Sequence, residues 1–459
     1  MGFEGEFASY EPLRRILSSE KIQALQQRMR VQPTIPNVET IKKNIVTLND
    51  LPKRTIQQPD WILAIDGSHL EGQPEKGYPG AEYGVVTIAS VLIDLKKISE
   101  HEKNDFIDPK KFRETEKASS QESLFPGSNI VIDSEKDAKA SLRRMIFEEL
   151  GNMRIFSDGE TLLETYEHLF RIKRQFNDTH HPRNPIDDNY ELVYNDGEYD
   201  CPDTREKLFS TDALRLHELM NPNGTNGELF GQIMSTLEKL WLINILRWFE
   251  ISNNLHILQR VAFIVDGPLA VFSTSSWLTK VIEVEIERIN EKQKKINGED
   301  IIILGLEKSG AFVRHFIDID ISKEGISDIF PRQSAFLLSD DYIKKNIIYS
   351  ESTKPYGKDT YFGRKFFYKT ASGQKLVSVL ACYSEEQRDL KTANVNQFPR
   401  LTDVLQLLDR LVSSRYQNSI SPLISAHAEA AIPLHLGKRL FEEIAREIAA
   451  SSKVSGTSK

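Results

Sequence analysis

The sequence predicts an α/β fold in which helices flank a mixed β-sheet and a large helical and loop-rich insertion interrupts it. Two apolar, strand-like segments end in the same Asp-Gly pair, WILAIDG at 61–67 and VAFIVDG at 261–267. Between them lies a long apolar segment, 227–252, of helical length. β-branched runs alternate with amphipathic segments through the last half of the chain, which is typical of a sheet with helices on its faces.

The length, composition and net charge limit the classes of protein that this chain can belong to. The chain has 459 residues, 39% of them hydrophobic, which is enough for a sizeable core. Its formal net charge of −8 argues against a globally basic nucleic-acid coat but permits a local basic groove. The two cysteines, Cys201 and Cys382, are far apart, so we expect no disulfide framework and a cytoplasmic location. No signal peptide or membrane span is expected.

The first half of the chain divides into three parts. Residues 1–60 are expected to hold an N-terminal helix, packed by its apolar face, and a linker. Residues 61–95 are expected to begin the core, with one strand ending at Asp66 and a longer β-branched strand after a turn. Residues 96–225 are charged and loop-rich, with helical patterns at 137–152 and 159–176. We interpret them as an insertion and not as an independent catalytic domain.

Residues 226–450 are expected to complete the core, and residues 451–459 to form a disordered tail. The first segment of this part is apolar almost all round, which predicts a deeply buried helix. Strand and helix patterns alternate after it. The expected elements are helices at 227–252, 276–296, 401–415 and 428–449, strands at 260–265 and 301–306, and a hairpin turning at 371–373.

Asp66 and Asp266 are the first candidates for chemistry. Each follows a buried strand, and each precedes a glycine that would let the chain turn away. An Asp-Gly pair alone is usually only a turn, but two in one chain favour a pair of carboxylates at one edge of a sheet. Like charges that close repel, and a divalent cation offsets the repulsion. Oxygen ligands suit Mg²⁺ or Mn²⁺, which activate water and stabilise the charge that develops in phosphodiester cleavage.

Glu238 is the candidate third acid. A crossover helix between parallel strands runs antiparallel to them, so its N-terminal half lies near the strands' carboxyl ends. This geometry favours Glu238 over Glu250 at the far end and Glu228 at the very start. Glu238 stands among apolar neighbours, so its burial needs a partner or a metal. A structural pair with Lys239 or Arg247 is the competing interpretation.

His427 is expected where a loop containing Pro422 becomes the final helix, and there it could ligate a metal or move a proton. A lone histidine in such a place more often caps a helix or packs in the core. Tyr416 just precedes that loop. Lys308 follows a buried strand and could pair with a phosphate, although a solvated charge is the default interpretation.

A segment rich in basic and aromatic side chains, Lys354–Lys375, is the candidate nucleic-acid surface. Such a mixture suits stacking on bases together with phosphate contacts. An ordinary aromatic hairpin with a polar outer face explains the pattern equally well. The candidate nucleic-acid contacts are Lys308, Lys358, Arg364, Lys365 and Lys369.

The ordered set of motifs resembles the NurA nucleases. FASYEPLRR near the start, AIDGSHL, FIVDGPLAVF, LGLEKSG and SPLISAHAEAAI occur in the family's order, across about residues 8–450. The resemblance implies an RNase H-like core and metal-dependent DNA exo- and endonuclease activity, with Mn²⁺ preferred to Mg²⁺. It also implies a ring-shaped homodimer that docks on a hexameric HerA-type ATPase in DNA end processing. DNA repair and anti-phage defence both stay open as biological roles.

The resemblance also assigns site residues. Asp66 matches the family's first-strand aspartate, Asp266 its second, and His427 the histidine of the late Ala-His motif. Tyr416 matches a tyrosine upstream of it, whereas Glu238 rests on geometry. The expected catalytic set is therefore these five residues, with all but Tyr416 as metal ligands. The long insertion departs from compact family members, so their DNA path and partner surface do not carry over.

Two other function classes compete with a nuclease. A non-catalytic ring subunit could clamp DNA for an ATPase. An actin-like phosphotransferase also places Asp-Gly turns at strand ends to hold phosphates, but it needs glycine-rich loops on both halves, and these turns carry one glycine each. No G-x-x-x-x-G-K-[ST] sequence occurs, so we expect no ATP hydrolysis by a P-loop.

Overall fold

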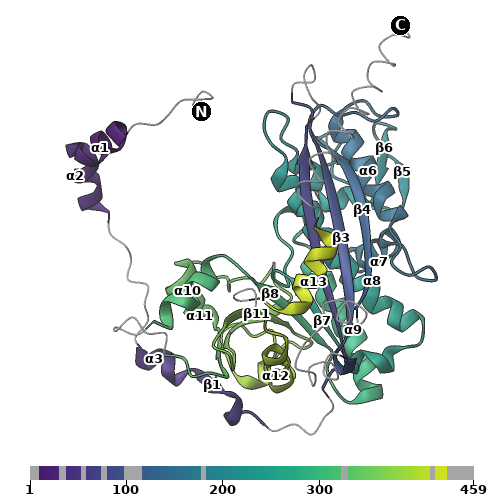
Figure 1. Cartoon of the computed structure of the whole chain (residues 1–459). Coiled ribbons are helices and arrows are strands. Elements are labelled where there is room, and N and C mark those ends of the chain that lie inside the picture. Colours follow the sequence, from purple (N-terminus) through teal and green to yellow (C-terminus); the bar gives the residue numbers. More distant parts are fainter. Residues whose placement is uncertain are drawn as a thin grey trace.

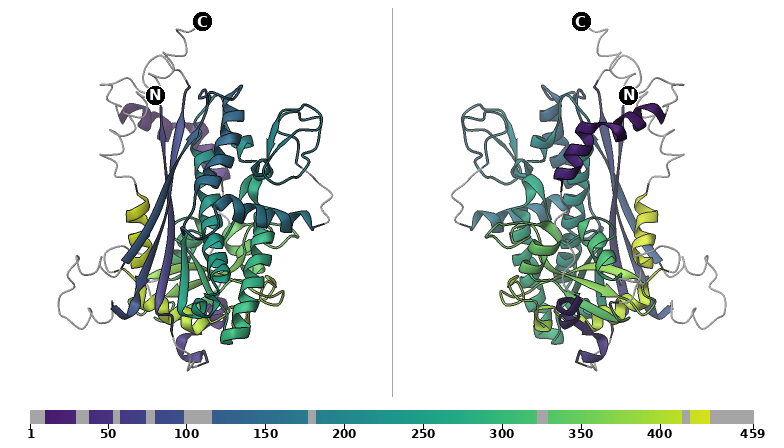
Figure 2. Two further views of the ribbon diagram at one scale, coloured as in Figure 1. Left: turned by 90° about the vertical axis from the view of Figure 1, so that its right-hand side faces the viewer. Right: turned by 90° about the vertical axis from the view of Figure 1, so that its left-hand side faces the viewer.

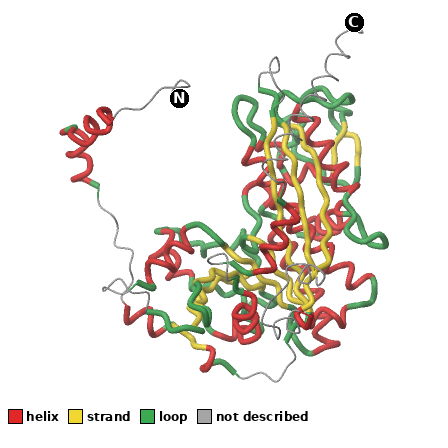
Figure 3. The backbone as a smooth tube through the Cα atoms, in the orientation of Figure 1, coloured by secondary structure: helices red, strands yellow, loops and turns green. Residues whose placement is uncertain are grey.

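The centre of the computed structural model is a nine-stranded mixed sheet (Figures 1 and 3). The structure describes residues 10–29, 38–52, 58–73, 80–97, 116–176, 182–321, 329–413 and 419–431. The strands lie side by side in the order β1-β9-β10-β11-β8-β7-β2-β3-β4. Their bounds are β1 Ile45–Thr47, β2 Trp61–Gly72, β3 Tyr83–Asp94, β4 Glu116–Pro126, β7 Val261–Asp266, β8 Ile302–Glu307, β9 Ser334–Leu337, β10 Gly363–Lys369 and β11 Lys375–Ala381.

Five of these strands form an RNase H-like core, four of them expected from the sequence and the fifth, β4, not. β2 pairs with β3 and β3 with β4, both antiparallel. On the other side of β2 the sheet continues with β7 and then β8, which run parallel to β2. This confirms the predicted RNase H-like α/β class, with a mixed sheet flanked by helices. β11, β10, β9 and β1 extend the sheet antiparallel beyond β8. β4 falls within residues 96–225 and β1 within residues 1–60, so segments expected to be insertion and linker contribute edge strands.

Helices cover both faces of the sheet, and the alternation of side chains along β2 shows why (Figure 2). Leu63 and Ile65 face one hydrophobic cluster, whereas Ile62 and Ala64 face another. The first cluster holds α6 (Ala138–Asn152), α7 (Leu162–Arg174), α8 (Gly227–Ile251) and α9 (Leu278–Asn297). The second holds α12 (Leu401–Leu411) and α13 (Ser421–Ala430). α10 (Ala311–Ile319) and α11 (Asp340–Ile343) contribute to a third cluster.

α8 is deeply buried in the core, as its sequence predicts. Its stretch from Thr236 to Arg247 is buried without interruption, with Trp241 fully enclosed. The predicted insertion helices α6 and α7 are confirmed, and their apolar faces join the same cluster as α8. The segment expected to be an insertion therefore shares the main core. None of the helices in the described ranges is long and apolar enough to cross a membrane.

The N-terminal prediction is wrong in two respects. The expected single helix is two, α1 (Tyr10–Ser18) and α2 (Glu20–Arg28), which stand away from the sheet (Figure 1). Their described side chains do not pack by an apolar face: α2 has no buried residue, and Met29 just after it is 72% exposed. The segment expected to be linker contains α3 (Val38–Lys43) as well as β1. The expected tail at 451–459 and most of the helix at 428–449 lie outside the described residues.

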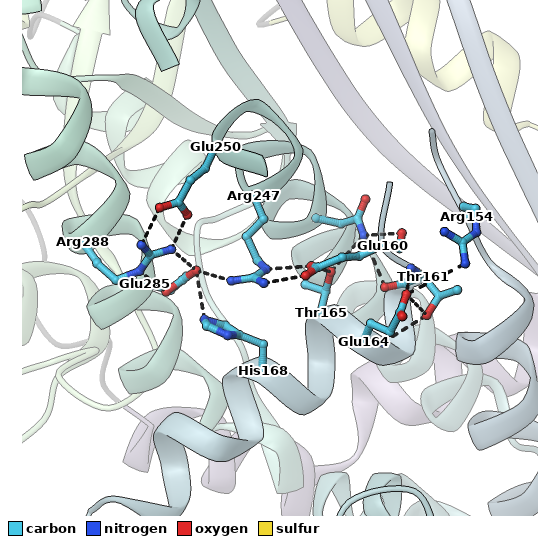
Figure 4. Close-up of polar contacts among 11 residues, drawn as sticks. Arg154, Glu160, Thr161, Glu164, Thr165, His168, Arg247, Glu250, Glu285 and Arg288 are labelled. Carbon is cyan, nitrogen blue, oxygen red and sulfur yellow. Dashed lines mark hydrogen bonds and ion pairs between the residues drawn. The ribbon is translucent and has the colours of Figure 1, made fainter. Parts of the chain in front are cut away.

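A buried network of charges joins α7, α8 and α9 (Figure 4). Glu285 of α9 is fully buried and accepts bonds from Arg247 at 2.9 Å and from Arg288 at 2.8 Å, and it lies 3.1 Å from His168. Burial raises the pKa of Glu285, but the hydrogen bonds from Arg288 and His168 outweigh burial and lower it. Arg247 also bonds Glu160 at 2.7 Å, so it is not the partner of Glu238.

We predict that Glu285→Gln destabilises the protein by about 3–5 kcal/mol, because it leaves Arg247 and Arg288 without their shared buried anion. The matched control is Asp341→Asn, which breaks the exposed Asp341–Lys345 pair and should cost less than about 1 kcal/mol. Urea unfolding of the two variants measures the difference. Equal losses of stability in both variants would contradict a structural role for the network.

Candidate active site

Asp66 lies in the middle of β2 and not at its end, which corrects the sequence prediction. β2 continues to Gly72, and Gly67 pairs with Ile88 of β3 in regular register. Gly67 is needed for space and not for a turn, since a Cβ there would lie 2.7 Å from the Glu238 carboxylate. The second Asp-Gly pair behaves as predicted: Asp266 ends β7, and Gly267 turns the chain with a φ of +76°.

Parallel pairing brings the two aspartates together. Ile65 of β2 pairs with Val265 of β7, so the next residue on each strand is the aspartate. Asp66 is 2% exposed, whereas Asp266 is half-buried and lies nearer the surface. Asp266 accepts a bond from the Gly267 amide at 3.1 Å and pairs with Lys308 at 3.0 Å. The two carboxylates are therefore adjacent, and a lysine offsets part of their charge.

Glu238 of α8 joins this pair from the helix side. It is buried, its carboxylate accepts a bond from Lys239 at 2.9 Å, and it also accepts one from the Gly67 amide. Lys239 is buried as well. Sequence reasoning offered this Glu-Lys pair as the competing interpretation, and the structure contains it beside the aspartates. The two interpretations are compatible because the pair lines the same pocket as Asp66 and Asp266.

The position of Glu238 follows from how α8 crosses β2. Gly227 lies against Glu71, and Gly231 lies against His69. Residue numbers thus rise along α8 as they fall along β2, which is the antiparallel crossing used to select Glu238. Glu250 at the far end of α8 pairs with Arg288, away from the aspartates.

His427 contacts Asp66 from the opposite face of the sheet. Its Nδ1 lies 3.0 Å from Asp66 Oδ2, and its side chain is 60% exposed. The expected place of His427 at the start of a final helix is wrong. Pro422 stands in the first turn of α13, so His427 lies inside the helix, and α13 packs across β2 and β3 (Figure 1). Tyr416 lies outside the described residues.

The electrostatics of the site are those of crowded buried carboxylates. Burial, then the neighbouring Asp266 and Glu238, raise the pKa of Asp66 to about 8, against a lowering effect of Lys308. Burial also raises the pKa of Glu238, opposed by Lys239. The three acids line a pocket of about 240 Å³ with Lys239, Phe272 and the Gly267–Pro268 turn. Such a site favours a bound proton or cation.

The oxygen donors suit a hard divalent cation, but they are engaged by other partners in this structure. His427 is bonded to Asp66, Lys308 to Asp266 and Lys239 to Glu238. In the part of the chain that the structure describes, no three His, Cys, Asp or Glu side chains stand ready to coordinate a metal. A cation would therefore have to take the place of one or more of these partners.

The predicted nucleic-acid contacts separate into two groups. Lys308 and Lys358 are exposed. Arg364, Lys365 and Lys369 are buried, so the structure does not offer them to DNA, which corrects their assignment. Arg364 donates to backbone carbonyls, Lys365 pairs with Glu307, and Lys369 pairs with Asp320 at 2.9 Å. The hairpin of β10 and β11 is confirmed, but these three basic side chains form hydrogen bonds and ion pairs inside the protein.

An acidic pocket at the meeting of two parallel strands of a mixed sheet defines an α/β protein of the RNase H-like class. The NurA domain model matches residues 61–432, and the chain belongs to the NurA family. The crystal structure of the NurA nuclease from Sulfolobus solfataricus aligns over 98% of both chains with 11% identity and a TM-score of 0.34. A crystal structure of NurA with manganese aligns over 92% of both chains with 10% identity and a TM-score of 0.20. No curated protein matches the sequence.

We predict that Asp66→Asn stabilises the protein in EDTA, and more so as the pH rises. The pKa of Asp66 is raised from 3.8 to about 8 in the folded protein. Below about pH 4 the carboxyl is protonated in both the folded and the unfolded chain, so it does not lower the stability. As the pH rises toward 8 only the folded protein keeps this proton, and the free energy of unfolding falls. The asparagine keeps the size and carries no charge. The Tm advantage of the variant over the parent should therefore grow across this range.

The control for this prediction is Asp341→Asn, at an exposed acid, whose effect on Tm should not grow in the same way. Differential scanning fluorimetry across the pH series measures both differences. An Asp66→Asn effect that is constant with pH would contradict the crowded-carboxylate description.

Proposed function

We propose that this NurA-family protein is a DNA nuclease that hydrolyses phosphodiester bonds with a divalent cation, Mn²⁺ or Mg²⁺, held at the acidic pocket. One observation carries the proposal: Asp66 and Asp266 stand side by side on adjacent parallel strands, with Glu238 in the same pocket. Adjacent buried carboxylates are costly unless a positive charge relieves them. A divalent cation bound there would supply an activated water and a charge to stabilise the developing phosphorane.

The proposed roles follow from the contacts of each residue. Asp66 and Asp266 would hold the cation, and Glu238, paired with Lys239, would complete the acidic wall. Lys308 would exchange Asp266 for a phosphate oxygen of the DNA, because its Nζ is already at the pocket and partly exposed. His427 would move a proton, since its exposed imidazole is oriented by Asp66. Tyr416 is a further candidate from the family motif alone.

Asp66→Asn and Asp266→Asn should each reduce DNA cleavage by orders of magnitude, because the cation loses a charged ligand. His427→Ala should reduce the rate less, by about 10²–10⁴-fold, as is typical of acid–base help. Linear duplex and single-stranded DNA are digested by the parent and variants in Mn²⁺, Mg²⁺ or EDTA, with Tm measured on the same samples. EDTA should abolish cleavage by the parent.

The same experiment separates the alternatives. If the parent binds DNA but cleaves none in either metal, a non-catalytic DNA clamp is the better description. If the aspartate variants cleave as fast as the parent, the proposed metal site is wrong. If they lose activity together with their folded structure, the aspartates are structural.

We also propose, from family membership, a homodimer that works in the cytoplasm with a HerA-like hexameric ATPase, in DNA end processing or anti-phage defence. Light scattering at micromolar concentration should give twice the mass of the chain, and affinity purification from the native host should recover an ATPase. A strictly monomeric mass without such an ATPase would contradict this assembly.

A further inference from the structure

A second and larger pocket lies beside the acidic pocket. Its volume is about 660 Å³, within the range of roughly 300–1,000 Å³ usual for ligand sites. Two short paired backbone segments, 269–272 and 360–362, separate the two pockets. Ala270, which lines the acidic pocket, forms a β-bridge with Tyr361, which lines the larger one. The amide of Val271 bonds the Thr360 carbonyl at 2.9 Å, and the amide of Phe362 bonds the Leu269 carbonyl at 3.0 Å.

Four aromatic side chains line the larger pocket. Phe176, Trp277, Tyr356 and Tyr361 come from three separate segments of the chain, with both tyrosines on the same loop. The rings of Tyr356 and Tyr361 lie 5.7 Å apart, and their hydroxyl groups lie 3.3 Å apart. Phe272 meets Tyr361 edge to face across the wall at 5.7 Å. Aromatic faces of this kind stack on nucleobases of any sequence.

Cations are the second component of the lining. Lys and Arg residues outnumber acids seven to five around this pocket. Lys365 is buried, pairs with Glu307, and its Nζ lies 4.6 Å from the centre of the Tyr361 ring. Lys358 and Lys391 are exposed and form no ion pair with the described residues. Uncommitted cations beside aromatic faces attract an anion that carries a ring.

Arg364 strengthens this conclusion, because its guanidinium is fully buried and forms no ion pair with any carboxylate that the structure describes. It donates instead to the carbonyl oxygens of Gln387, Asp389 and Thr392. These bonds fix the segment that carries Asp389 and Lys391 at the pocket. Burial still lowers the pKa of Arg364 despite the nearby charge of Asp389, and an anion bound nearby would offset more of the cost of burying the guanidinium.

We propose that this pocket binds a nucleoside monophosphate, with the base against Tyr356, Tyr361 and Phe176 and the phosphate near Lys358 and Lys391. The buried acid Glu283 lines the pocket too and can accept a hydrogen bond from a base or sugar. The ligand is either a free mononucleotide or the terminal nucleotide of a DNA strand. Its binding needs neither the divalent cation nor catalysis, so it can fail or succeed independently of the proposed nuclease function.

Trp277 is a built-in reporter for the test, since it lines the pocket. Tryptophan fluorescence of the full-length protein is titrated in EDTA with dAMP, deoxyadenosine or inorganic phosphate. We expect dAMP to change the emission and to bind about tenfold or more tightly than either of its parts, because it makes both the stacking and the charge contacts. Trp277→Phe should remove the signal. No signal from dAMP in the parent, or phosphate binding as tightly as dAMP, overturns the proposal.

Variants locate the binding site. Phe176→Leu and Lys358→Ala should each weaken dAMP binding several-fold, whereas Lys345→Ala, at an exposed lysine outside the pocket, should not. Asp66→Asn should leave the affinity unchanged. Loss of binding in Asp66→Asn with none in Phe176→Leu and Lys358→Ala would place the ligand in the acidic pocket and overturn the proposal. A short 5′-phosphorylated oligonucleotide, compared with dAMP, distinguishes a strand end from a free nucleotide, and tighter binding of either one supports the pocket.

Discussion

Parallel pairing of β2 with β7 imposes the constraint on which the rest of the site depends, because it sets two carboxylates side by side in a largely buried place. The surrounding residues reduce the cost of this arrangement. Lys308 pairs with Asp266, and His427 contacts Asp66 from the other face of the sheet. Gly67 leaves room for Glu238, and its amide donates to that carboxylate. These contacts do not remove the whole cost, because the pKa of Asp66 is still raised. A carboxylate with a raised pKa among other acids marks a site that favours a bound cation.

α8 links this site to residues 96–225, the segment expected to be an insertion. Glu238 in its middle faces the aspartates, whereas Arg247 and Glu250 near its end belong to the charge network with α7 and α9 (Figure 4). α7 comes from the expected insertion, so the insertion braces the helix that carries the third acid. A side chain held on a rigid, well-anchored helix keeps its position better than one on a loop. α7 therefore supports the site indirectly, at a distance from it.

Much of the fold could be predicted from the sequence, because the central strands are continuous β-branched runs and α8 is apolar all round. β4 could not, since its polar sequence EKASSQES resembles a solvated loop and only its pairing with β3 makes it a strand. The turn expected at Gly67 was wrong for the same reason, because the local sequence does not show the pairing with β3 that keeps β2 continuous through this glycine. Burial of Lys369 depends on Asp320, about fifty residues earlier in the chain, which no local pattern reveals. Asp66, Asp266 and Glu238 were predictable as a group because strand direction and helix crossing follow general rules.

The central claim is that the acidic pocket is built to hold a divalent cation, and direct metal binding tests it without any substrate. Electron paramagnetic resonance measures free Mn²⁺ as the full-length protein is titrated into a fixed concentration of the ion. We predict that the parent removes the free-ion signal in a saturable way, and that a variant carrying both Asp66→Asn and Asp266→Asn, folded by its Tm, leaves the signal nearly intact. Equal uptake of Mn²⁺ by the parent and this variant would contradict the account.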